Sequence, residues 1–369
     1  MKIIHLFRSP VGGIFRHVRD LLSQQVANGH EVGIICDSST GGNHEEMLFE
    51  QIIPDLKLGL HKFAIPRSIT PVDALILLKT CKQLRSIQPD IVHSHGAKGG
   101  IHARLAAKLV QTRSHPIKTY YCPHGGAMHY DAGSIKGKLF FTVERFMERF
   151  TDSLIFVSDY ERKAYHEKVG RPTCPEAIVY NGLSAEEFEP VEETATAADF
   201  LYIGMMRDLK GPDVFLDALH LVRKEAGDHV TGMFVGDGPD KNAYITQISK
   251  LGLNDAVSIH DAMPAREAFA KGKIIVAPSR AESMPYLVLE AIAAHKTIIA
   301  TDVGGLPEIF MERADDLVQP GDARALADKM LETLKLTDRK QKSTEFAKDL
   351  RKKFSLPAMA SSVEKVYSR

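Results

Sequence analysis

The sequence predicts an α/β protein with two doubly wound parallel sheets, and three observations lead to this fold class. Short apolar runs rich in β-branched residues alternate with stretches of helical periodicity, which is the pattern of βαβ units. The alternation stops at an acidic, Ala- and Thr-rich stretch, residues 184–199, and restarts after it. A length of 369 residues fits two domains at roughly 100–200 residues each.

The first half begins with a predicted buried strand, residues 2–7. Ile14 starts an amphipathic helix, because apolar residues recur at i, i+4, i+7 and i+8 before the Asn28-Gly29 turn. A second helix is predicted at 101–110. The remaining strands are predicted at 31–36, 90–93, 118–122, 153–157 and 178–180.

The second half repeats this order after the acidic linker. Strands are predicted at 200–203, 231–235, 257–259, 274–277 and 298–300, and helices at 212–224, 241–251, 266–271 and 287–294. The domains are therefore placed at 1–185 and 186–353. A helix within 354–369 is expected to return to the first domain.

Composition excludes several classes of protein. Lys+Arg and Asp+Glu are 47 each, so a generally basic nucleic-acid binder is excluded. No apolar run approaches the roughly 18 residues of a membrane-spanning helix. The N-terminal apolar stretch is too short for a signal peptide, so we expect a cytoplasmic protein. The four cysteines contain no Cys-x-x-Cys pair and are expected to be reduced core thiols.

The zero net charge hides an asymmetry between the halves. Residues 1–183 hold 23 Lys+Arg against 17 Asp+Glu, and residues 184–369 hold 24 against 30. Twelve of the sixteen histidines also lie in the first half. A basic first domain either has an ordinary solvated surface or meets an anionic partner, such as a lipid headgroup surface or an acidic glycan.

Loops that follow predicted strands are the candidate ligand sites, because open parallel sheets bind ligands beyond the carboxyl ends of their strands. The loop 9–13 places Gly12 and Gly13 at the start of the first helix, where backbone N–H groups attract a phosphate. A tight turn is the alternative. The loop lacks the Gly-x-Gly-x-x-Gly pattern, which disfavours a Rossmann dinucleotide site.

Two further loops belong to the second half. The loop 204–211 carries Arg207 and Lys210, which together could neutralise a diphosphate. An exposed basic pair is the alternative. The loop 235–239 contains Gly236, and its glycines would let the backbone pass close to a flat ring or a ribose. An ordinary turn is an equal alternative.

The strongest pattern is the stretch 277–290, APSRAESMPYLVLE. Pro285 suits the first position of a helix, with Glu282 before that helix and Glu290 inside it. Eight residues span up to about 12 Å in a helix, which suits two hydroxyl-bearing sugars on either side of a diphosphate facing the helix amides. A lone glutamate at a helix start is usually a cap, whereas Glu290 in an apolar run needs a partner.

Together these residues resemble the retaining nucleotide-sugar glycosyltransferases of family 4, which have the GT-B fold of two Rossmann-like domains facing a cleft. The family's Glu-x7-Glu signature stands here as Glu282 and Glu290. Pro278-Ser279 precedes it, and ATDVGGLPE follows at 300–308. The resemblance covers most of the chain and is densest from 200 to 310. Each piece alone is common, but the ordered set is specific to the family.

The resemblance implies roles for the second-half residues. Glu282 would hold hydroxyls of the donor sugar and Glu290 the ribose. Arg207 and Lys210 would bind the diphosphate and offset its charge as it leaves. The remaining substrate contacts would come from Gly236, Met284, Pro285 and Tyr286.

The resemblance also implies roles in the first half. Gly12 and Gly13 would bring backbone amides to the phosphate and acceptor side. His124, in Cys-Pro-His-Gly, matches the family's strand-end histidine, which sits close to the donor sugar. Asn181-Gly182 matches a structural turn near the domain junction.

Two positions depart from the family pattern. The gap between Arg207 and Lys210 is shorter than in many relatives, which puts their sharing of one diphosphate in doubt. His295 stands where the family usually has glycine, and Thr297 where proline is frequent. Because glycine there normally ends the helix in a left-handed turn, this corner is expected to differ.

The implied reaction transfers a sugar from a nucleoside-diphosphate donor to an acceptor hydroxyl with retention of anomeric configuration. No residue plainly supplies a nucleophile, so the leaving phosphate would take the acceptor proton, and catalysis would rest on positioning and charge stabilisation. No Asp-x-Asp motif occurs, so neither a divalent metal nor another cofactor is expected. A nucleotide-sugar epimerase and a non-catalytic sugar-nucleotide-binding protein are the alternatives.

The acceptor implied by the resemblance is a glycan or glycolipid of cell-surface polysaccharide or lipopolysaccharide synthesis. Two basic stretches, 98–118 and 135–150, could touch the inner face of an anionic membrane. In the second, the simpler interpretation is a helical stripe facing the core, formed by Leu139, Phe140, Val143, Phe146 and Met147.

Overall fold

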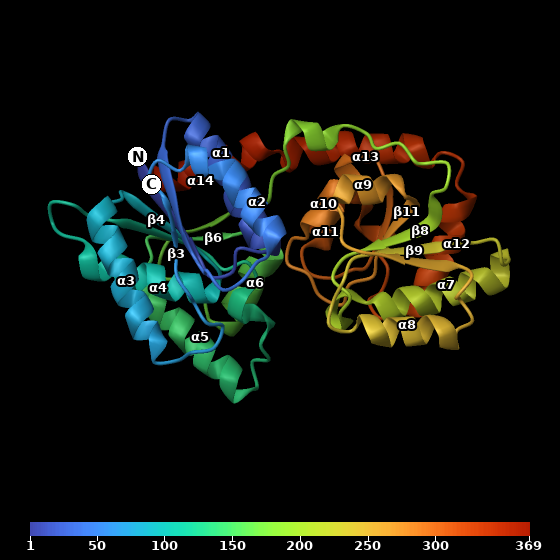
Figure 1. Ribbon diagram of the computed structural model, residues 1–369, viewed down its shortest axis with the longest axis horizontal. Helices are drawn as coiled ribbons and strands as arrows, with labels where there is room; N and C mark the ends of the chain where they lie inside the picture. The colour runs from blue at the N-terminus through green and yellow to red at the C-terminus, as the bar shows by residue number, and fades with distance from the viewer. The chain divides into compact units, whose positions relative to one another are not determined.

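The computed structural model describes residues 1–369, except the side chains of Ala127 and His129, and the chain divides into two compact units (Figure 1). Unit 1 comprises Met1–Gly182 and Leu356–Arg369, and unit 2 comprises Leu183–Ser355. The predicted boundaries lie at 185/186 and 353/354, within three residues of these. The last helix, α14 (Leu356–Tyr367), is part of unit 1.

Unit 1 is built on a seven-stranded sheet in the order β3-β2-β1-β4-β5-β6-β7, with every neighbouring pair parallel. The chain runs outward from β1 in one direction and then restarts at β4 on its other side, so the order reverses between these two strands. The strands are β1 (Lys2–Phe7), β2 (Glu31–Cys36), β3 (Leu60–Lys62), β4 (Ile91–His95), β5 (Lys118–Cys122), β6 (Ser153–Phe156) and β7 (Glu176–Ile178).

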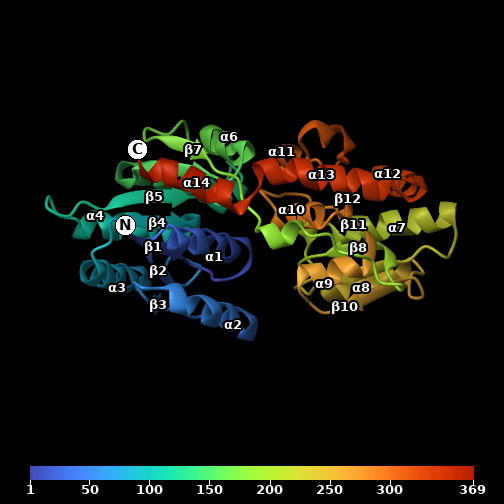
Figure 2. The ribbon, with the colours of Figure 1, turned by 90° about the horizontal axis from the view of Figure 1, so that it is seen from above.

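Helices cover both faces of this sheet, because alternate residues of each strand are apolar toward opposite sides. Phe7 packs with Phe15 on α1 in one cluster, whereas Ile4 packs with Leu84 on α3 and Ala103 on α4 in another. Figure 2 shows the red helix α14 beside β5. The helices are α1 (Gly12–Ala27), α2 (Asn43–Ile52), α3 (Val72–Ile87), α4 (Gly96–Val110), α5 (Ile135–Met147) and α6 (Asp159–Lys168).

Unit 2 has a five-stranded parallel sheet in the order β10-β9-β8-β11-β12, so its order reverses between β8 and β11. Phe215 on α7 and Met330 on α12 pack on one face, and Phe269 on α9 and Ala291 on α10 on the other. The strands are β8 (Ala198–Ile203), β9 (Gly232–Val235), β10 (Val257–His260), β11 (Gly272–Ala277) and β12 (Thr297–Ala300). The helices are α7 (Pro212–Ala226), α8 (Lys241–Lys250), α9 (Ala265–Ala270), α10 (Tyr286–Ala293), α11 (Leu306–Phe310), α12 (Ala323–Lys335) and α13 (Arg339–Lys353).

The predicted strands are confirmed to within a few residues, with one shift and one omission. The strand expected at 178–180 is β7 at Glu176–Ile178, because Leu154, Ile155 and Phe156 of β6 pair with these three residues. The strand β3 and six helices were not predicted, namely α2, α3, α6, α11, α12 and α13. In α3, Leu75 and Leu78 are exposed, so the apolar run shows no one-sided period. All four cysteines are free thiols; Cys36, Cys81 and Cys122 are buried as expected of core thiols, whereas Cys174 is half-buried.

The stripe expected to face the core in residues 135–150 is only partly confirmed, because Met147 is buried and Phe140 packs against a buried cluster, whereas other members of the stripe are exposed. Leu139 is 56% exposed and Phe146 50% exposed, and Ile135 beside them is 88% exposed. The buried face of α5 is formed by Met147 together with Gly137, Phe141 and Glu144, which were not part of the predicted stripe. Glu144 is buried because it accepts hydrogen bonds from Arg104 Nη2 at 3.0 Å and from the Tyr121 hydroxyl at 2.9 Å. Among the described residues, no helix is both long and apolar enough to cross a membrane.

The corner after α10 keeps the left-handed turn that glycine usually provides, which corrects the expectation of a different conformation. His295 has φ of +58°, and Lys296 N–H donates to the Ala291 carbonyl at 3.0 Å, as in a Schellman motif. Nδ1 of His295 lies 3.3 Å from the Thr344 hydroxyl on α13. This contact helps to stabilise the histidine in a backbone conformation that non-glycine residues seldom adopt.

Candidate functional site

The loops after β8 and β11 meet at the point where the strand order of unit 2 reverses, which is where open α/β sheets bind ligands. Nζ of Lys210, after β8, lies 2.6 Å from Oε1 of Glu282, after β11. The Ser279 hydroxyl donates to the same oxygen at 2.8 Å. Oε2 of Glu282 has no hydrogen-bond partner among the described residues, so the carboxylate can still accept from a ligand hydroxyl.

A second ion pair, which the sequence analysis missed, holds these two loops together. Arg280 donates to both carboxylate oxygens of Asp213, at 2.8 and 2.5 Å, and to the Asp208 carbonyl at 2.7 Å. Hydrogen bonding to the Asp213 carboxylate raises the pKa of Arg280. Gly211 has φ of +67°, and a Cβ there would lie 2.1 Å from the Pro278 carbonyl oxygen. Any side chain at Gly211 would therefore push the two loops apart.

Arg207 lies at the start of the 3-10 turn Asp208–Lys210, and Lys210 N–H donates to its carbonyl at 2.9 Å. Its side chain is exposed and has no partner among the described residues. The structure thus brings Lys210 into contact with Glu282, whereas Arg207 makes no contact with that pair among the described residues. Whether Arg207 and Lys210 bind one diphosphate despite their short spacing in the sequence stays a prediction.

Gly236 follows β9 and is buried against the loop after β8. Its φ is +142°, and a Cβ there would lie 2.1 Å from the Gly204 carbonyl oxygen. Gly204 N–H donates to Val235 and Gly236 N–H to His260. The glycine is therefore required by the close approach of two backbone segments, and its predicted role in substrate binding stays a prediction.

The signature segment forms a loop followed by α10. Pro285 is the residue before the helix, not its first residue, with φ −74° and ψ 120°. Because 282–285 is not helical, the 12 Å spacing expected for a continuous helix does not apply to Glu282 and Glu290. Met284 and Tyr286 are buried and Glu290 is half-buried. The first turn of α10 contains no acidic residue, so the positive end of this helix suits an anion.

The corresponding position in unit 1 lies between β1 and β4. Gly12 begins α1 with φ of +63° and open space around its α-carbon, and Gly13 follows in the exposed first turn. This turn has no acidic residue and no side-chain cap. Its N–H groups are therefore available to a phosphate or carboxylate.

His124 follows β5 in a left-handed conformation, φ +51°. Nε2 of His124 lies 3.0 Å from Nδ1 of His95, and its ring meets the His17 ring edge-on at 4.8 Å between centroids. Its loop is anchored by Glu161, which accepts hydrogen bonds from Gly125 N–H and from Val157 N–H at 2.9 Å. Burial raises the pKa of Glu161 to about 7.

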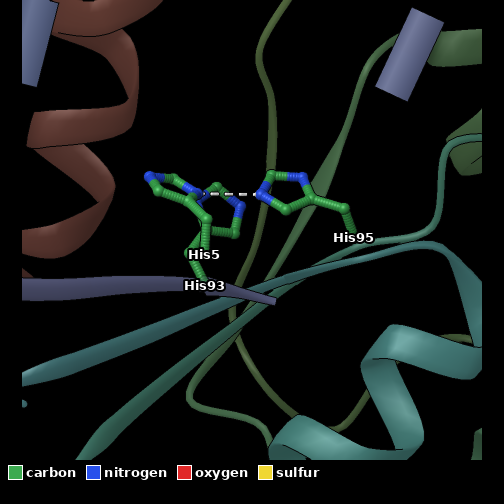
Figure 3. Close-up of side chains that lie close together, drawn as sticks. All are labelled: His5, His93 and His95. Carbon is green, nitrogen blue, oxygen red and sulfur yellow. Dashed lines mark hydrogen bonds between the residues drawn. The ribbon is translucent and has the colours of Figure 1, made fainter. Parts of the chain in front are cut away.

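Behind His124 lies a cluster of buried histidines that the sequence analysis missed. His5 on β1 and His93 on β4 are neighbours in register, and His95 lies two residues further along the same face (Figure 3). Nδ1 of His5 lies 3.0 Å from Nε2 of His95. Burial lowers the pKa of His5 and of His17 to about 4 and lowers those of His93, His95 and His124 as well. The available signal was the pair His93 and His95, two residues apart at the end of the strand predicted at 90–93.

Two overlapping sets of these imidazoles have one ring nitrogen each within 4.8 Å of one another. Such spacing is compatible with a transition-metal ion such as Zn²⁺. The sets are His5, His93 and His95, and His17, His95 and His124.

Comparison with known proteins places these features in a family. A model described as Glycosyltransferase Family 4 matches residues 11–187, and one described as Glycosyl transferases group 1 matches 197–336. A putative glycosyltransferase, EpsD of Bacillus subtilis, is 30% identical over 286 residues, covering 72% of this chain and 74% of its own. The chain belongs to the group 1 glycosyltransferases.

Other members share less sequence but the same fold. A putative teichuronic acid biosynthesis glycosyltransferase, TuaC of Bacillus subtilis, is 28% identical over 69% of this chain and 64% of its own. The crystal structure of a glycosyltransferase from Rickettsia africae has a TM-score of 0.78 at 19% identity, covering 100% of this chain and 97% of that one. These comparisons confirm the GT-B fold and the glycosyltransferase family that the signature residues predicted.

Proposed function

We propose that this glycosyltransferase moves a sugar from a nucleoside-diphosphate donor to a hydroxyl of a glycan or lipid-linked acceptor, with retention of anomeric configuration, in cell-surface polysaccharide or lipopolysaccharide synthesis. The observation that carries the proposal is the contact between Lys210 and Glu282 where the sheet order of unit 2 reverses. The name of the relative TuaC, which refers to teichuronic acid, and structures of lipopolysaccharide glycosyltransferases with the same fold support the acceptor class.

On this proposal the donor binds through side chains and backbone groups of the loops after β8 and β11. Lys210 uses one N–H on Glu282 and has two for diphosphate oxygens. Oε2 of Glu282 accepts a donor-sugar hydroxyl, and Glu290 binds the ribose. Arg207 and the first-turn N–H groups of α10 add positive charge as the diphosphate leaves. Such charge stabilisation is often the largest contribution to catalysis.

The other predicted contacts complete the proposed site. Gly12 and Gly13 bring N–H groups to the phosphate and acceptor side, and His124 touches the sugar. The leaving phosphate takes the acceptor proton on the face that it leaves, so no protein nucleophile is required. Neither a divalent metal nor another cofactor is part of this mechanism.

Incubation with a panel of sugar nucleotides and a glycolipid acceptor, with and without EDTA, tests the reaction. We expect a glycoside with the anomeric configuration of the donor, formed equally well in EDTA, because protein cations replace the metal. The configuration is measured by the anomeric coupling constant in proton NMR. A product of inverted configuration would contradict the retaining mechanism. Loss of turnover in EDTA would contradict the metal independence. Epimerisation of the donor in the absence of acceptor would contradict the assignment as a transferase.

We further propose that α5 touches an anionic membrane surface where lipid-linked acceptors reside, which would place the protein at the inner face of the cytoplasmic membrane. The exposed apolar residues Ile135, Leu139 and Phe146 lie on a helix that also carries exposed Lys136 and Lys138. Apolar residues with flanking cations are typical of interfacial helices. A groove of about 830 Å³ beside them is also lined by Arg145, Arg149 and Lys168.

Changing Ile135 and Leu139 together to aspartate is expected to abolish co-sedimentation with vesicles containing an anionic lipid, because the change removes apolar area and adds negative charge. Both side chains are exposed, so the fold should persist. Leu78→Asp is the control, since Leu78 is 65% exposed on α3 and should leave binding unchanged. Equal sedimentation of the double variant and the wild type, or binding that is insensitive to salt, would overturn the membrane proposal.

A further inference from the structure

A chain of hydrogen bonds runs through the interior of unit 1 from His124 to the C-terminal helix. Behind the contact of His124 with His95, Nε2 of His95 meets Nδ1 of His5 at 3.0 Å, and Nε2 of His5 meets Oε1 of Gln25 at 2.8 Å. Figure 3 shows the His5–His95 contact within the cluster. His5, His95 and Gln25 are 0–1% exposed, so water does not compete for these bonds.

The chain continues to α14. Nε2 of Gln25 donates to the Tyr367 hydroxyl at 3.3 Å, and that hydroxyl lies 2.7 Å from Nδ1 of His93. Tyr367 is buried against Tyr120, with 4.6 Å between ring centroids. The far end of the chain is therefore fixed by a helix that lies more than two hundred residues beyond β5 in the sequence.

The orientation of the Gln25 amide gives every bond in the chain one direction. Its Oε1 can only accept, so His5 donates from Nε2 and its Nδ1 carries a lone pair. His95 must then donate from Nε2 to His5, which leaves its own Nδ1 as an acceptor. His124 must therefore donate from Nε2 to His95. Each of the three imidazoles in this hydrogen-bonded chain, those of His5, His95 and His124, is therefore neutral and has one defined tautomer.

We propose that His95, supported by His5, Gln25 and Tyr367, is a positioning residue that fixes His124 in the tautomer protonated on Nε2, so that Nδ1 presents a lone pair to a sugar hydroxyl. Nδ1 of His124 has no hydrogen-bond partner among the described residues. A neutral acceptor at this point selects an O–H donor and disfavours a phosphate oxygen. This inference rests on the proposed function only for the identity of the ligand.

The geometry favours this chain over a metal site in the same cluster. A cation bound by His5, His93 and His95 would take the proton's place between Nδ1 of His5 and Nε2 of His95, although the 3.0 Å spacing of these atoms suits a direct hydrogen bond. It would also require His95 to donate toward His124, which reverses that bond. The orphan nitrogen Nε2 of His93 is the one feature that a metal would explain better, so metal binding belongs among the outcomes of the test.

The test uses protein labelled with ¹⁵N at its histidines and long-range proton–nitrogen NMR, which reports the protonated nitrogen of each ring. We expect His124 to be protonated on Nε2 in the wild type. Tyr367→Phe should give a mixture of the two His124 tautomers, because Gln25 loses the contact that orients it. Tyr120→Phe is the matched control: the Tyr120 hydroxyl donates to the Tyr367 carbonyl at 3.2 Å but lies outside the chain, so His124 should be unchanged.

His95→Phe removes the acceptor of His124 directly. We expect about a five- to tenfold lower kcat/KM, the effect of one lost hydrogen bond, together with loss of the fixed tautomer. If this variant does not fold, the wild-type spectrum and the comparison of Tyr367→Phe with Tyr120→Phe still test the proposal. His124 protonated on Nδ1 in the wild type, or equal effects of the two tyrosine changes, would overturn the proposal, as would stoichiometric Zn²⁺ binding that His93→Ala abolishes. The tautomer is measured without substrate. The tautomer proposal can therefore fail while the proposed transferase reaction is confirmed, and the transferase proposal can fail while the predicted tautomer is observed.

Discussion

Lys210→Ala is expected to lower kcat about 10²–10³-fold, the usual effect of removing one charge-stabilising contact from a transition state. Lys210 is the cation nearest to Glu282, at 2.6 Å, and on the proposed mechanism its charge offsets that of the leaving diphosphate. Glu282→Ala should reduce turnover to a similar extent, because it removes both the proposed sugar contact and the partner that positions Lys210. The measurement is kcat with a saturating sugar nucleotide and acceptor.

The control for this prediction is a second lysine–carboxylate pair, which lies within β8 and β11, the two strands that precede the loops of Lys210 and Glu282. Nζ of Lys273 lies 2.8 Å from Oδ1 of Asp199, at the amino ends of β11 and β8, whereas the candidate site lies beyond their carboxyl ends. Lys273→Ala should therefore leave kcat within about twofold of the wild type, the range of a weak surface ion pair. Near-normal turnover in a folded Lys210→Ala enzyme would contradict the assignment of the site.

Acidification is expected to unfold unit 1 steeply between pH 6.5 and pH 4. Burial lowers the pKa of His5 and His17 to about 4 and also lowers those of His93, His95 and His124. In this range the unfolded chain binds protons that the folded chain does not, so stability rises with pH and is lost as pH falls. Each histidine contributes up to about 1.4 kcal/mol per pH unit, so five approach the whole stability of a typical domain.

Glu161 acts in the opposite direction, because burial raises its pKa to about 7. Between its ordinary value and 7 the folded state binds the extra proton, so this one group stabilises the fold as pH falls. It offsets about one of the five histidines, and the net effect remains strong destabilisation by acid.

Urea unfolding followed by circular dichroism at several pH values measures the change, since the chain contains no tryptophan. Hydrogen exchange in β1 and β4 assigns the effect to unit 1. His17→Gln should reduce the pH dependence by about one proton, whereas His44→Gln, at an exposed position on α2, should not change it. A free energy of unfolding that is constant from pH 7 to pH 5 would show that the cluster takes up protons within the folded state.

Local sequence determined most of the secondary structure in both units. The strands β1, β2 and β5 have the predicted bounds, because runs of β-branched and apolar residues buried on both faces differ clearly from helical periodicity. The signature from Pro278 to Glu290 was sufficient to indicate the family, because its chemistry lies within one loop and one helix. Residues of that kind are close in sequence and therefore visible in it.

Only the tertiary structure decided which side chains meet. Lys210 and Glu282 are far apart in sequence, and their contact follows from the adjacency of β8 and β11. The exposure of Leu139 and Phe146 depended on which face of α5 buries Glu144 for Arg104 and Tyr121. The histidine chain needed the pairing of β1 with β4 and the return of α14 with Tyr367. Sequence periodicity reports the burial of one element, whereas these contacts depend on the order in which elements pack.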